Sequence, residues 1–223
     1  MTRTTNARLA GFTYLFYIAV GITGMVVSSG STSGVGTAAK LASIAQHVPQ
    51  LRAAVLLNLL AGFSALVLGA ALYGITRDED HELAILALAC RIGEGVNGVF
   101  SIQTTLGLLW LATAGDRAGA PDVATKNALL ASLLMPEPPI GAIFFAAGST
   151  IFCYLLLRGR MIPAPLAWLG LLASVLLVVA LPLQAVGILT GIFTSFMVMW
   201  MPMLVFEIAA ALWLIVKGVA APT

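Results

Sequence analysis

Residues 82–114 read ELAILALACRIGEGVNGVFSIQTTLGLLWLATA, a mostly apolar stretch that is long enough to cross a bilayer. The stretch nevertheless contains Arg91 and Glu94, which are three residues apart and therefore share one face of a helix. A charged side chain at the centre of a membrane-spanning helix costs about 2.5–3.5 kcal/mol on insertion scales, so such residues face a bundle interior and need partners there. The stretch therefore predicts the central helix of a polytopic membrane protein.

The whole chain has the composition of a membrane protein. Hydrophobic residues make up 60% of its 223 residues and charged residues only 9%, whereas soluble domains are about 25% charged. The polar connections are too short to form a separate soluble domain, so we predict one integral membrane domain over residues 1–223. The net charge of +2 is too small and too scattered to indicate binding to nucleic acid.

The apolar segments predict an all-α fold, a polytopic transmembrane bundle of six helices. The expected spans are residues 7–27, 51–76, 82–114, 140–157, 166–186 and 192–216. Pro182 and Pro202 fall inside the last two spans, where we expect them to kink the helices.

Two short helices, at about residues 38–47 and 123–134, are expected to lie at the membrane surface on the outer side. Asp122 is positioned to cap the second of them, and Pro49 is expected to end the first. Ser28–Gly36, which reads SSGSTSGVG, predicts a flexible loop before the first short helix.

The basic residues predict the orientation of the chain. Two very short loops, 77–82 and 158–163, carry arginines, and the bias of basic residues towards the cytoplasm is most informative in short loops. We therefore predict a cytoplasmic (inner) membrane protein with both termini in the cytoplasm. The cytoplasmic side then holds Arg3, Arg8, Arg77, Arg158, Arg160 and Lys217, and the outside holds Lys40, Arg52, Arg117 and Lys126.

Polar side chains from three predicted spans fall at a similar depth. At a rise of ~1.5 Å per residue, two tyrosines, one guanidinium and two carboxylates lie roughly 9–18 Å from the cytoplasmic face. The candidate residues for substrate binding or proton linkage are Arg91, Glu94, Glu207, Tyr14, Tyr17 and Asn97. A second, uncharged polar set of Asn58, Gln103 and Gln184 falls nearer the outer face.

The charged set has two interpretations. Arg91, Glu94 and Glu207 together carry one positive and two negative charges when ionised, and an unpaired carboxylate in a low dielectric tends to take up a proton. Two carboxylates that compete for one arginine would then form a proton-linked element in a polar cavity. Alternatively, Arg91 bridges both carboxylates only to hold two helices in register. In both interpretations we expect Glu207 to pair directly with Arg91.

No sequence motif indicates a catalytic reaction. The motifs G-x-S-x-G, H-E-x-x-H and the P-loop are missing, so the sequence leaves open whether the protein is an enzyme. No group of His, Cys and carboxylate residues has the spacing of a metal site, and we expect no metal and no cofactor. Cys90 and Cys153 lie inside predicted spans and are expected to be free thiols.

Four segments resemble those of a known family. They read ARLAGFTYLFYIAVGI at 7–22, ACRIGEGVNGVFSIQTTLGLLWL at 89–111, CYLLLRGRMIPAPLAWLGLLA at 153–173 and FEIAAALWLIVKG at 206–218. In this order, and over nearly the whole chain, they resemble the bacterial six-helix integral membrane family named domain of unknown function forty-three eighty-six. The resemblance implies a six-helix membrane fold and no established activity, and it points to Arg91, Glu94 and Glu207 as polar positions within the matching segments.

Three functions fit these observations. The leading one is a multi-pass membrane protein with an intramembrane polar cavity that binds or transports a small molecule, a lipid or a proton. The first alternative is an intramembrane enzyme that acts on a lipid or isoprenoid, with Glu94 or Glu207 as acid or base. The second is a structural or regulatory membrane subunit without catalysis. We expect membrane lipids and a small-molecule or lipid ligand as partners, and the sequence is compatible with a homo-oligomer.

Overall fold

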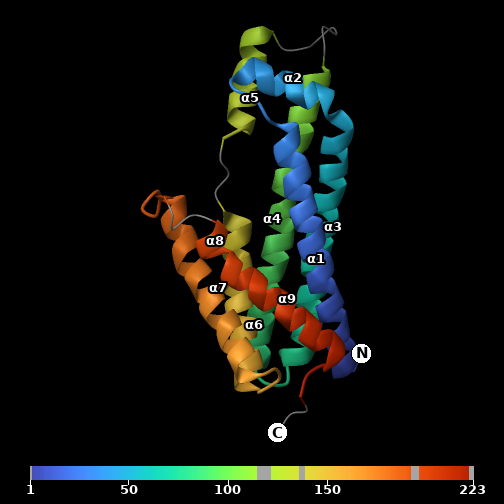
Figure 1. Cartoon of the computed structure of the whole chain (residues 1–223), viewed down its shortest axis with the longest axis vertical. Helices are drawn as coiled ribbons and strands as arrows, with labels where there is room; N and C mark the ends of the chain where they lie inside the picture. Colours follow the sequence, from blue (N-terminus) through green and yellow to red (C-terminus); the bar gives the residue numbers. More distant parts are fainter. Residues whose placement is uncertain (1, 115–121, 136–138, 192–195, 221–223) are drawn as a thin grey trace. The chain divides into compact units, whose positions relative to one another are not determined.

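The structure is a computed structural model that describes residues 2–114, 122–135, 139–191 and 196–220. These residues form helices α1 to α9, and the part of the chain that is described contains no strand (Figure 1). The chain divides into two compact units, which are described separately. Unit 1 comprises Met1–Ile18, Gly62–Asn97 and Pro138–Thr223, and unit 2 comprises Ala19–Ala61 and Gly98–Glu137.

Among the described residues, five helices are long and apolar enough to cross a membrane. They are α1 (Arg3–Ser31), α3 (Val48–Thr76), α4 (His81–Thr113), α6 (Ile140–Arg158) and α7 (Ala164–Ala185). The shorter helices are α2 (Thr37–Gln46), α5 (Val123–Leu133), α8 (Phe196–Met199) and α9 (Met201–Val216). The predicted all-α, multi-pass membrane fold is confirmed, whereas the single domain and the orientation stay predictions.

In unit 1, α6 and α7 form a hairpin and lie side by side (Figure 1). Helix α9 packs against α7 and α1 through two glycines. A Cβ added at Gly170 would lie 2.5 Å from Cε2 of Phe206, and one added at Gly11 would lie 2.6 Å from the carbonyl oxygen of Ala211. Small residues allow this close approach between helices in a membrane, where packing rather than the hydrophobic effect holds helices together.

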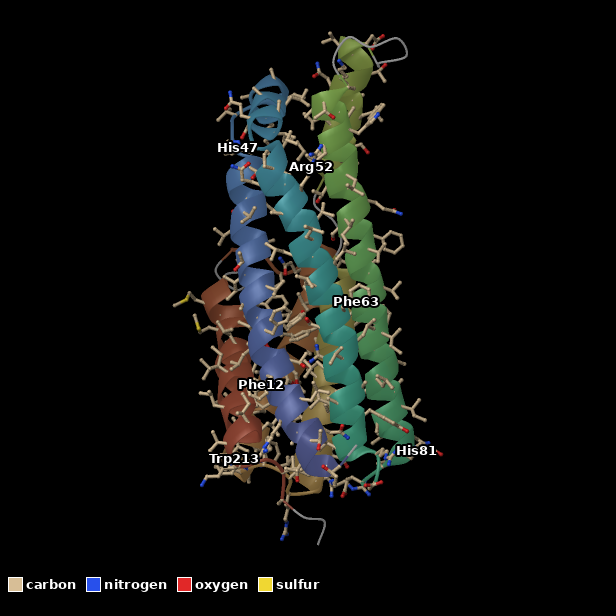
Figure 2. All side chains as sticks on the ribbon, turned by 90° about the vertical axis from the view of Figure 1, so that its right-hand side faces the viewer. Phe12, His47, Arg52, Phe63, His81 and Trp213 are labelled. Carbon is tan, nitrogen blue, oxygen red and sulfur yellow. The ribbon has the colours of Figure 1, made fainter. Side chains whose placement is uncertain are left out.

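The outer surface of unit 1 is covered by large apolar side chains, among them Phe12 and Phe63 (Figure 2). More than half of the surface of each of these two phenylalanines is exposed. Apolar patches of this extent are rare on soluble monomers and are expected where a protein contacts lipid.

Unit 2 contains the two short helices, and α2 and α5 lie against each other (Figure 1). They share a small apolar core made of Ile44, Leu51, Leu108, Leu109, Leu111 and Leu130. Asp122 caps α5 as predicted, because its Oδ1 accepts a hydrogen bond of 2.7 Å from the backbone N–H of Thr125. Both predicted short helices are therefore present, and their place on the outer side of the membrane stays a prediction.

Two predicted helix ends differ from the structure. Helix α1 continues to Ser31, whereas the sequence predicted a loop from Ser28. The hydroxyl of Ser31 is satisfied within the helix by a hydrogen bond of 2.7 Å to the carbonyl of Val27. Pro49 does not separate a surface helix from the second span. It lies in the first turn of α3, where a missing N–H removes no helical hydrogen bond.

The predicted sixth span is not one continuous helix. Residues 192–195 of that span lie outside the described residues, and the rest forms α8 and α9, which are separated at Trp200. Pro202 therefore begins a helix instead of kinking one, as its fixed φ and missing N–H favour. Helix α9 has 16 residues, fewer than the roughly 20 that usually cross a bilayer. Pro182 does lie inside α7, in its last turn.

Candidate functional site

Arg91 is the largest fully buried side chain of the described residues, with 0% of its surface exposed. Its Nη1 donates a hydrogen bond of 2.8 Å to Oε2 of Glu94, and its Nη2 donates one of 3.0 Å to Oγ of Ser149. The guanidinium carbon also lies 4.7 Å from the ring centroid of Phe145, within the range of a cation–π contact. Since Ser149 and Phe145 belong to α6, Arg91 joins α4 to α6.

Glu94 uses both of its carboxylate oxygens. Oε2 accepts from Arg91, and Oε1 accepts a hydrogen bond of 2.7 Å from the hydroxyl of Tyr17 on α1. Only 9% of the Glu94 side chain is exposed, so the Arg91–Glu94 pair is a buried one. The resulting chain of hydrogen bonds runs from Tyr17 through Glu94 and Arg91 to Ser149, and it connects α1, α4 and α6 inside unit 1.

Two glycines make room for the stem of Arg91. A Cβ added at Gly69 of α3 would lie 2.8 Å from Cβ of Arg91, and one added at Gly148 of α6 would lie 3.0 Å from Cβ of Cys90 and 3.7 Å from Cγ of Arg91. The neighbouring helices therefore contact α4 closely on both sides of the arginine. This packing fixes the position from which the guanidinium extends.

Glu207 lies on α9 and is 5% exposed, yet it does not form the ion pair with Arg91 that the sequence predicted. No ion pair within 4.0 Å joins these two described residues. The terminal nitrogens of Arg91 bond to Glu94 and Ser149 instead. Glu207 is nevertheless close enough to Arg91 and Glu94 for their charges to interact.

Two buried polar atoms of this region have no hydrogen-bond partner among the described residues. They are Oε1 of Glu207 and Nε of Arg91. Buried polar groups are nearly always hydrogen-bonded in folded proteins, and leaving one unpaired costs about 1–3 kcal/mol. An unused acceptor and an unused donor thus lie in the same buried cluster, which we call the Arg91 site (Tyr14, Tyr17, Arg91, Glu94, Ser149 and Glu207).

The remaining candidates make none of the hydrogen bonds that join Tyr17, Glu94, Arg91 and Ser149. Tyr14 is buried on α1 and is included in the Arg91 site because it lies near the charges of Arg91 and Glu207. Asn97 is half-buried, and its side chain contacts α6 at Gly141. Of the second polar set, Gln184 is exposed in unit 1, whereas Gln103 is exposed and Asn58 half-buried in unit 2.

Sequence reasoning missed three residues that shape the site: Phe145, Ser149 and Gly148. A usable signal existed for two of them. Gly148 and Ser149 form a small-and-polar pair in the otherwise apolar segment of α6, and such pairs are typical of helix contacts in membranes. The described residues contain no group of three or more His, Cys, Asp or Glu side chains that could hold a metal ion.

Residues 9–218 match the family described as Domain of unknown function (DUF4386). The chain belongs to this family. The matched range of DUF4386 contains every residue of the Arg91 site. Neither the curated proteins nor the solved structures include a match to the chain.

Proposed function

We propose that this protein is a multi-pass membrane protein whose Arg91 site binds or transports a small molecule, a lipid or a proton. One observation carries the proposal. The carboxylate oxygen Oε1 of Glu207 is buried in unit 1 without a hydrogen-bond donor from any described residue. Burial of an unpaired carboxylate is expensive, so a bound species that supplies a proton or a donor group explains why this side chain is there.

The geometry favours binding over a purely structural role. A cluster that only held helices in register would be expected to satisfy its own polar atoms, because a partly satisfied network is less stable than an apolar core. Glu94 and Ser149 fit a structural role, since each is bonded to Arg91. Glu207 and Nε of Arg91 do not fit it.

The proposal is tested by identifying what the purified protein carries. Native mass spectrometry and lipidomics are performed on wild-type protein and on the Glu207→Gln variant, with Glu82→Gln as the control because Glu82 is an exposed carboxylate at the start of α4. We expect a species that co-purifies with the wild type and with Glu82→Gln but not with Glu207→Gln. Proton uptake into proteoliposomes is measured on the same three proteins.

Two results would reject binding. If all three proteins carry the same species and show no proton uptake, the Arg91 site has no ligand. If Glu207→Leu then raises stability, the site belongs to a structural or regulatory subunit.

An intramembrane enzyme is the remaining alternative, because an unpaired carboxyl can also act as acid or base. It predicts Glu207-dependent conversion of lipids in a membrane extract.

We also propose that the protein lies in the cytoplasmic membrane with both termini inside, which the basic residues of the short loops support. Cysteines introduced singly at residues 32–36 and 78–80 test the orientation with an impermeant thiol reagent. Labelling is expected from the periplasmic side only at 32–36, and labelling at 78–80 from that side would reverse the orientation.

A further inference from the structure

The formal charges of the Arg91 site do not balance. Arg91 contributes one positive charge, and Glu94 and Glu207 contribute two negative charges if both are ionised, which leaves a net charge of minus one in a buried region. The guanidinium of Arg91 pairs with Glu94 and not with Glu207: its Nη1 donates to Glu94 at 2.8 Å, and its Nη2 donates to Ser149 at 3.0 Å. The two carboxyl groups therefore have different surroundings.

Glu94 has the surroundings of an ionised carboxylate. One of its oxygens accepts a charge-assisted hydrogen bond from Arg91, and the other accepts the hydroxyl hydrogen of Tyr17 at 2.7 Å. Both carboxylate oxygens of Glu94 are therefore satisfied by hydrogen-bond donors, one of which is charged.

Glu207 has the opposite surroundings. The titratable or charged groups near it are Tyr14 and Tyr17 on α1, Arg91 and Glu94 on α4, and Cys153 on α6. Arg91 is the one cation in this set, and it makes no ion pair with Glu207. Helix α7, which also packs against α9, contributes no titratable side chain in its range. A buried carboxylate without a direct cationic partner takes up a proton in preference to staying charged.

We infer that Glu207 is the proton-binding group of the Arg91 site, held as the neutral acid while Glu94 remains ionised beside Arg91. This inference rests on the proposed function and specifies its ligand as a proton. On release, the O–H bond of the Glu207 carboxyl breaks, the carboxylate keeps the electron pair and the proton passes to water. On uptake the same steps run in reverse, so no other reactant is needed.

Infrared difference spectroscopy on the full-length protein in lipid vesicles tests the inference. A protonated carboxyl shows a carbonyl stretch that is separate from the amide and carboxylate bands and shifts in D₂O. We expect this band in the wild type at pH 7 and expect its loss when the pH is raised. Glu207→Gln should abolish the band, whereas Glu94→Gln and the exposed control Glu82→Gln should keep it.

Two outcomes overturn the inference: the absence of the band from the wild type at pH 7, or its loss in Glu94→Gln with retention in Glu207→Gln.

Thermal stability at pH 7 is a second measurement that needs no ligand. Gln has the shape of a protonated Glu, so Glu207→Gln should leave the melting temperature within a few degrees of wild type, and Glu94→Gln should lower it more. The reverse order also contradicts the inference.

The inference and the proposed function can fail separately. If a species other than a proton depends on Glu207 for binding and the infrared band is missing, the proposed function holds and the proton assignment is wrong. If the band is present and titrates but no ligand and no proton uptake are found, Glu207 binds a proton as inferred and the proposed transport is wrong.

Discussion

Replacement of Arg91 by Leu should be the most damaging single substitution in the Arg91 site. The change removes two hydrogen bonds from a charged group, each worth about 1.5–3 kcal/mol, and one desolvated cation–π contact with Phe145, worth about 2 kcal/mol. Leu restores part of the packing, and Glu94 can take up a proton once its partner is gone. The net loss should therefore be close to the 3–5 kcal/mol that is typical of breaking a buried ion pair.

The partner of Arg91 is identified by double-mutant cycles. Arg91→Leu is combined with Glu94→Gln and, separately, with Glu207→Gln, and free energies of unfolding are measured in detergent micelles under conditions where unfolding is reversible. The Arg91–Glu94 cycle should show a coupling of at least about 1.5 kcal/mol, because the two side chains are 2.8 Å apart. The exposed control Arg77→Leu should change stability by less than about 0.5 kcal/mol. Additive losses for Arg91 and Glu94, or a larger coupling with Glu207, would refute this account of the site.

Four further substitutions probe the packing and the helix ends. Ser149→Ala removes one interhelical hydrogen bond from the charged guanidinium of Arg91 and should cost about 1.5–3 kcal/mol in the same unfolding assay. Gly69→Ala should cost about 1–3 kcal/mol, because its Cβ would lie 2.8 Å from Arg91, whereas Gly21→Ala should be nearly neutral, because no described atom outside its own helix lies within 4 Å. The hydrogen bond from the backbone N–H of Thr125 lowers the pKa of the Asp122 carboxyl. The stabilisation of α5 by this carboxylate is therefore complete above the ordinary pKa of an aspartate, and it is lost as the pH falls through the lowered pKa of Asp122. The protection factors of the α5 amides, which correct for the slower intrinsic exchange in acid, should therefore fall as the pH is lowered, and Asp122→Asn should abolish this dependence.

The sequence was sufficient to place the long helices, because the mean hydropathy of 18 or more residues depends little on any one residue. Helix ends depend instead on local contacts. The serine-rich end of α1 looks like a loop by composition, yet the hydroxyls of Ser29 and Ser31 bond to carbonyls of their own helix. Pro202 was expected inside a helix and begins one, since hydropathy does not distinguish a continuous span from two helices that meet at Trp200.

The site was only partly predictable for a geometric reason. Residue spacing places Arg91 and Glu94 on one face of α4, and the structure has them in contact. Counting residues along a helix estimates depth, and it placed Tyr17 and Glu207 at a depth similar to that of Arg91 and Glu94. Depth carries no information about rotation around the helix axis, so the sequence could not show that Tyr17 reaches Glu94 while Glu207 reaches neither charged group directly.

The Arg91–Glu94 pair lies within one helix, and this has a consequence for how the chain is inserted into the membrane during synthesis. Helix α4 brings its own counterion, so arginine and glutamate can neutralise each other before α6 has been translated. Helix α9 has no basic residue between Met201 and Val216, and its carboxyl cannot be neutralised locally except by a proton. We therefore expect α4 to enter the bilayer with its charges already paired, without waiting for a partner on a later helix.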